Sequence, residues 1–232
     1  MAQVTPHAAS RTGLAQPSTV FPELAVPAGL AILTVPGLYG SGPDHWQSRW
    51  EARFPDWERV VQHDWARPSL HLWAGQVGAT VARRRATAPR GVVLVAHSFG
   101  CLAVVYQAAL DSTGIAGALL VAPADPDRFG VGPLLPAFRL PFPTVLAASR
   151  NDPWIAQRTA FSWGALWGAD VHDVGSLGHI NAESGLGTWP EGIALLGSLL
   201  QRIDASGLSA GPADGATPWE AGVEVHGAVP YI

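Results

Sequence analysis

The stretch that decides the fold reads Val92-Val93-Leu94-Val95-Ala96-His97-Ser98-Phe99-Gly100. Its β-branched first half predicts a buried strand, and the apolar run that follows predicts a helix from 99 to about 111. Ser98 stands between them, with the small residues Ala96 and Gly100 two positions to either side, although the pattern prefers glycine at the first. This predicts a sharp turn that raises a serine hydroxyl at a sheet edge, over a helix N-terminus that favours developing negative charge. A buried strand-to-helix junction with an incidental serine fits the same residues.

Outward from this stretch, short apolar runs alternate with longer helical patterns. The expected strands are 31–35, 59–62, 92–95, 118–121, 144–148 and 171–174. The expected helices are 45–53, 69–85, 99 to about 111, about 155–167 and 189–203. This alternation predicts an α/β fold, with a mostly parallel sheet covered by helices on both faces. We expect the domain to span 28–204, between a loose leader over 1–27 and a Gly-, Ala- and Pro-rich tail over 205–232, in which Val223-Glu224-Val225 alternates like a short strand.

Composition and net charge limit the functional classes to which this chain can belong. A chain of 232 residues suits one domain with a substantial core. Charged residues make up only 14% and the net charge is −4, which leaves no electrostatic footprint for nucleic acid or an anionic membrane. The single cysteine, Cys101, excludes an intrachain disulfide, and the absence of lysine excludes a lysine nucleophile. We therefore expect a cytoplasmic protein with no nucleic-acid or membrane partner, while a protein partner stays open.

Polar residues after two later strands complete a candidate catalytic set. A nucleophilic serine needs a base, and the base needs an orienting carboxylate, on loops at the carboxyl ends of strands. Asp152 follows the expected strand 144–148, and His179 follows 171–174. We expect Ser98 to be the nucleophile, His179 the general base and acid, and Asp152 the group that holds the imidazole in its tautomer. The chain order is that of the α/β-hydrolase triad. Asp152 before a proline also fits a helix N-cap.

The glycine-rich loop 36–43 follows the first expected strand. Such a loop predicts a backbone donor for an oxyanion, and we expect the amides of Phe99 and Leu38 to form the oxyanion hole. The expected substrate-binding residues around it are Gly37, Tyr39, His45, Trp46, His97 and Trp154. Within that set, Trp46 and Trp154 are expected to form an apolar acyl pocket, with His97 as a wall residue. The sequence has no metal-ligand spacing and no nucleotide-binding glycine motif, so we expect neither metal nor cofactor.

Several segments taken together carry a family resemblance. They are Val35-Pro36-Gly37, Ser41-Gly42-Pro43-Asp44-His45-Trp46-Gln47, Asp64-Trp65-Ala66-Arg67-Pro68, Ala96-His97-Ser98-Phe99-Gly100, Asn151-Asp152-Pro153 and Gly178-His179-Ile180-Asn181. The chain resembles the YdeN-like and retinoblastoma-binding-protein-9-like serine hydrolases over about 31–203. The resemblance implies a compact α/β-hydrolase with little or no cap domain, and a triad that matches Ser98, Asp152 and His179.

The expected activity is that of a carboxylesterase-like serine hydrolase. It would cleave small-molecule esters or related acyl compounds through an acyl-serine intermediate. The segment 123–143 is too short for a separate helical cap, which predicts an open pocket for modest-sized substrates. An aminopeptidase-like amidase or an acyltransferase would use the same triad, and a catalytically silent interaction module on the same fold also stays open.

Overall fold

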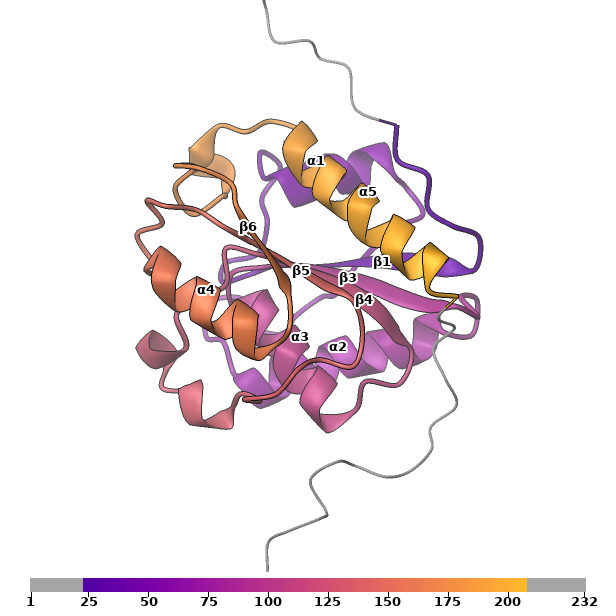
Figure 1. The fold of residues 1–232 in the computed structure, drawn as a ribbon, viewed down its shortest axis with the longest axis horizontal. Coiled ribbons are helices and arrows are strands. Elements are labelled where there is room, and N and C mark those ends of the chain that lie inside the picture. Colours follow the sequence, from indigo (N-terminus) through magenta and orange to yellow (C-terminus); the bar gives the residue numbers. More distant parts are fainter. Residues whose placement is uncertain (1–22, 208–232) are drawn as a thin grey trace, which may run out of the picture.

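The computed structural model describes residues 23–207 of the chain. Most of the expected leader and nearly all of the expected tail, with Val223-Glu224-Val225, lie outside the described residues. The described part contains one six-stranded sheet in the order β2-β1-β3-β4-β5-β6, and every neighbouring pair is parallel (Figure 1). Its strands are β1 (Leu30–Val35), β2 (Glu58–Arg59), β3 (Gly91–His97), β4 (Ile115–Val121), β5 (Thr144–Ala148) and β6 (Asp170–Asp173).

Helices cover both faces of this sheet. They are α1 (Trp46–Arg53), α2 (Leu70–Arg84), α3 (Phe99–Leu110), α4 (Gln157–Leu166) and α5 (Pro190–Ala205). Helices α1 and α5 lie over one face, and α2, α3 and α4 lie over the other (Figure 1). Each layer encloses its own buried apolar cluster, because the buried strands of a parallel sheet are apolar on both sides. No helix within residues 23–207 has both the length and the apolar character needed to cross a membrane.

The connection between β4 and β5 contains only two short 3-10 helices, η1 (Pro126–Phe129) and η2 (Gly132–Leu134). A third one, η3 (Ala182–Ser184), lies between β6 and α5. No cap domain is therefore inserted after β4, and the prediction of a compact α/β fold is confirmed.

Strands β2 and β4 differ most in extent from their predicted bounds. The sequence predicts a strand over 59–62, but β2 has only two residues. Strand β1 ends one residue after the Thr34↔Arg59 pair, so a longer β2 would have no partner. Strand β4 begins at Ile115, before the expected start at 118, and so includes Gly117, a residue type that weakens strands. A Cβ at Gly117 would lie 2.6 Å from Cδ1 of Ile203, so this glycine permits the close packing of α5 on the sheet.

Candidate active site

Ser98 occupies a strained turn between β3 and α3. Its φ is 53° and its ψ is −124°, a backbone conformation that a non-glycine residue rarely adopts. A Cβ at Gly100 would lie 2.4 Å from the Val35 carbonyl oxygen, so only glycine lets α3 start this close to β1. Ala96 is fully buried, as a strand residue behind the turn must be. The local sequence therefore folds as a nucleophile elbow.

The loops after β5 and β6 bring two more side chains to this turn. His179 Nε2 is 2.9 Å from Ser98 Oγ, and His179 Nδ1 is 2.9 and 3.0 Å from the two Asp152 carboxylate oxygens. A carboxylate accepts, so Nδ1 carries a proton and Nε2 is free to accept from the serine hydroxyl. The side chains of Asp152 and His179 are 1% and 9% exposed, which shields the pair from water.

Asp152 does not cap α4, the alternative that the sequence left open. The N-cap of α4 is Ala156, and the helix starts at Gln157. Asp152 Oδ1 instead accepts from the Trp154 amide at 2.8 Å, which fixes the carboxylate within its own loop. The same carboxylate thus has one local contact and one to His179.

The backbone amides of Phe99 and Leu38 are the candidate oxyanion donors. Phe99 is the first residue of α3, where a helix amide has no intrahelical partner. Leu38 lies in the loop after β1, and no hydrogen bond of its amide is found among the described residues. The next amide, of Tyr39, already donates to the Trp65 carbonyl at 2.8 Å, so it is engaged elsewhere. A Cβ at Gly37 would lie 2.6 Å from Ser98 Cβ, so this loop runs directly against the serine.

Two of the expected pocket side chains are exposed to solvent. Tyr39 is 75% exposed and Trp154 is 47% exposed. The Trp154 ring lies 6.1 Å from the His179 ring, and the guanidinium of Arg128 lies over its face at 5.7 Å. Arg128 comes from η1, so the β4–β5 connection reaches the rim of the site. Sequence analysis missed Arg128, since nothing in the sequence relates it to Trp154.

Three other expected pocket residues, Trp46, His45 and His97, are buried among other side chains. Trp46 is 1% exposed and packs against Trp50 at 4.5 Å and Trp189 at 5.2 Å. His45 and His97 are 4% and 5% exposed, with their rings 4.7 Å apart. Trp46 and Trp50 belong to the buried apolar cluster under α1, because this helix packs on the sheet with its aromatic face inward.

Burial keeps both of these histidines neutral. Desolvation, with smaller effects of Arg59 and His179, lowers the pKa of His45 to about 3. Desolvation, with His45 and His179 as further causes, holds the pKa of His97 well below its usual value. Neither side chain therefore adds positive charge next to the His179 imidazole at neutral pH.

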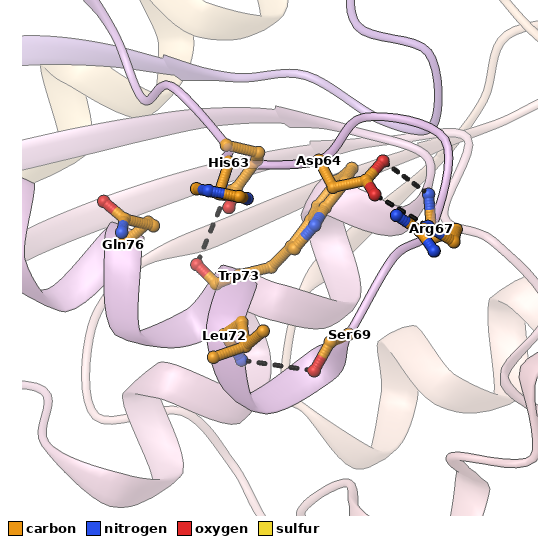
Figure 2. A pocket seen from close by; sticks show the side chains of 8 residues that line it. His63, Asp64, Arg67, Ser69, Leu72, Trp73 and Gln76 are labelled. Atoms are coloured by element: carbon orange, nitrogen blue, oxygen red, sulfur yellow. Dashed lines mark hydrogen bonds and ion pairs between the residues drawn. The ribbon is translucent and has the colours of Figure 1, made fainter.

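One cavity borders the candidate site, and a second cavity is lined by a different set of residues. One of about 320 Å³ borders the candidate site and is lined by Pro153, Trp154, Ser176, Leu177, Gly178, His179, Asn181, Glu183 and Ser184. The other, of about 380 Å³, is lined by Gln62, His63, Asp64, Arg67, Ser69, Leu72, Trp73 and Gln76 (Figure 2). Asp64 pairs with Arg67 in the lining of this second cavity. The second cavity is lined by none of the three residues Ser98, Asp152 and His179. Within residues 23–207, no group of three or more His, Cys, Asp or Glu side chains is placed to hold a metal ion.

A parallel sheet with a nucleophile elbow at the end of a central strand defines the α/β-hydrolase class. Residues 32–198 match the family model of the serine hydrolases, and the chain belongs to this family. No curated protein matches the chain.

Solved structures support the same assignment. A YdeN-like hydrolase from Pectobacterium atrosepticum is 40% identical, with 75% of this chain and 92% of that chain covered and a TM-score of 0.71. The ydeN gene product of B. subtilis is 17% identical, with 76% and 98% covered and a TM-score of 0.57. Est1E from Butyrivibrio proteoclasticus is 12% identical, with 80% and 89% covered and a TM-score of 0.53. The last two share the fold alone, and the predicted resemblance to YdeN-like hydrolases is confirmed.

Proposed function

We propose that this serine hydrolase cleaves small carboxylic esters through an acyl-serine intermediate on Ser98. The observation that carries the proposal is the continuous hydrogen-bonded chain from Ser98 Oγ through the His179 imidazole to the buried Asp152 carboxylate. Three residues far apart in sequence supply a nucleophile, a base and an orienting acid at hydrogen-bond distances, which is the arrangement that acyl transfer requires.

The reaction follows from these positions. His179 Nε2 takes the hydroxyl proton as Ser98 Oγ attacks the ester carbonyl, and Asp152 stabilises the imidazolium that results. The negative charge on the carbonyl oxygen is stabilised by the amides of Phe99 and Leu38. The C–O bond to the alcohol then breaks, and His179 returns the proton to the departing alcohol. Water, deprotonated by the same imidazole, hydrolyses the acyl-serine and releases the carboxylic acid.

The surroundings of the site favour acyl groups of modest size. The β4–β5 connection has only η1 and η2, so no cap encloses a long chain. The exposed Trp154 ring lies 6.1 Å from that of His179, and the exposed Tyr39 follows in the loop that runs against Ser98. We expect these two side chains to offer apolar surface to an acyl group or an aromatic alcohol. We propose that residues 28–204 form the catalytic domain, since β1 begins at Leu30 and α5 ends at Ala205, one residue beyond that bound.

A substrate screen tests the proposal. Hydrolysis of p-nitrophenyl esters of graded chain length is compared with that of aminoacyl amides, with Ser98→Ala as the baseline. We expect turnover of short esters above amides, and a loss of about 10⁴- to 10⁶-fold in kcat for Ser98→Ala. Equal rates in Ser98→Ala would refute the nucleophile. A preference for amides would retain the triad and replace the ester proposal, whereas folded protein without turnover on any substrate would favour the silent module.

A further inference from the structure

The loop that carries His179 is held by side chains from elsewhere in the fold. Two of its amides donate to side chains of the loop after β5: Leu177 N donates to Ser149 Oγ at 2.9 Å, and Gly178 N donates to Asn151 Oδ1 at 2.8 Å. Ser149 Oγ in turn donates to Asn151 Oδ1 at 2.9 Å. Sequence analysis gave neither Ser149 nor Asn151 a role, although short polar residues after a strand often accept from backbone amides.

The next two carbonyls of the same loop are held from the opposite side. His97 Nε2 is 2.9 Å from the His179 carbonyl oxygen, and Trp46 Nε1 donates to the Ile180 carbonyl at 2.8 Å. A carbonyl only accepts, so His97 carries its proton on Nε2 and donates it. Four consecutive residues, 177–180, therefore each have one backbone group bound by a side chain that is distant in sequence.

The backbone of this loop needs such external support. Ile180 has a φ of 50° and Gly178 a φ of 60°. A β-branched residue in the left-handed region is strained by about 1–3 kcal/mol and keeps that conformation only where the surroundings enforce it. Ile180 is also fully buried, so packing and the Trp46 bond act together to hold it.

We propose that His97 is a positioning residue that fixes the His179 imidazole relative to the Ser98 hydroxyl, which rests on the function proposed above. His97 directly precedes Ser98 at the end of β3, a strand paired on both sides within the sheet. The hydrogen bond to the His179 carbonyl therefore links the base to the same rigid element that carries the nucleophile. Small displacements of reacting groups have large effects on rate, so this link sets the catalytic geometry.

Variants at position 97 distinguish the effect of the hydrogen-bond donor from the effect of side-chain volume. His97→Leu fills the space without a donor, whereas His97→Gln retains an N–H near the position of Nε2. We expect His97→Leu to lower kcat on a short p-nitrophenyl ester by about 10- to 100-fold with little change in KM, and His97→Gln to recover most of the loss. The matched control is Leu94→Val on the same strand, which is buried against the opposite face of the sheet. It should retain wild-type kcat.

A second measurement does not depend on turnover. Hydrogen exchange of the peptide that contains 177–180 should be at least about tenfold faster in His97→Leu than in His97→Gln or the wild type. Trp46→Phe, which keeps a ring and removes the adjacent bond, should speed exchange in the same peptide and serves if His97→Leu does not fold. The positioning role would be overturned if His97→Leu had the kcat and the hydrogen-exchange rate of the wild type. It would also be overturned if His97→Leu and His97→Gln lost kcat equally. An inactive wild type would refute the proposed function, while the exchange comparison would still decide the role of His97.

Discussion

Acid should destabilise this protein through the buried imidazole of His45. His45 caps α1: its Nδ1 accepts from the Gln47 amide at 3.2 Å, so the neutral ring carries its proton on Nε2. That Nε2 is buried and has no hydrogen-bond partner among the described residues. Burial, and then Arg59 and His179, lower the pKa of His45 from 6.5 to about 3. The perturbation we choose is His45→Asn, because asparagine is also a good N-cap but does not titrate in this range.

The size of the effect follows from proton linkage. As the pH falls, the unfolded chain protonates His45 near its ordinary value, whereas the folded chain does not until the pH approaches about 3. The unfolded state therefore binds more protons between these two values, and the free energy of unfolding decreases as the pH falls through this window. From about pH 7 to about pH 5 the loss from this one group is about 2 kcal/mol. His97 acts in the same direction.

Urea unfolding at these two pH values measures the difference. The wild type should lose about 2 kcal/mol more than His45→Asn between them, because the other titrating groups are common to both proteins. His63→Asn is the matched control, because it removes an exposed imidazole in place of a buried one. If His45→Asn lost as much stability as the wild type, His45 would not be the buried neutral group described here.

Three further substitutions test the site. Gly37→Ala places a Cβ 2.6 Å from Ser98 Cβ and should lower kcat on a short ester by about 10²-fold; wild-type kinetics would show that the loop does not abut the serine. Asp152→Asn should lower kcat by about 10⁴-fold with the fold retained by circular dichroism, and undiminished turnover would remove Asp152 from the mechanism. Trp154→Ala should change the preference among acyl-chain lengths, because its exposed ring lies 6.1 Å from that of His179; an unchanged preference would exclude it from the acyl site.

Much of the fold could be predicted because each local pattern agrees with the global one. Buried β-branched runs alternate with helical periods, and a parallel sheet is the structure that accommodates this alternation. The approach of Ser98, Asp152 and His179 follows from the same topology, since all three lie in connections that follow strands, and the carboxyl ends of parallel strands share one edge. The order of these residues in the sequence and the positions of the strand ends were sufficient to predict that the three side chains approach one another.

The lining of the site could not be predicted in the same way. Position near the serine in sequence suggested that His97 faces substrate, and the glycine loop suggested the same for Trp46. Their actual partners are carbonyls 82 and 134 residues away, which depend on how α1 and the loop after β6 pack together. Burial of a polar aromatic side chain is a property of that packing, and no local pattern encodes it.

Covalent labelling identifies the nucleophilic residue of this hydrolase. The folded protein is treated with a fluorophosphonate, digested, and the modified residue is located by mass spectrometry. We expect one phosphonate adduct on the Ser98 hydroxyl, with labelling abolished by Ser98→Ala and slowed by several orders of magnitude in His179→Ala. An unmodified Ser98 in folded protein would contradict its assignment as the nucleophile, and equally fast labelling without the His179 imidazole would contradict the assignment of His179 as the base.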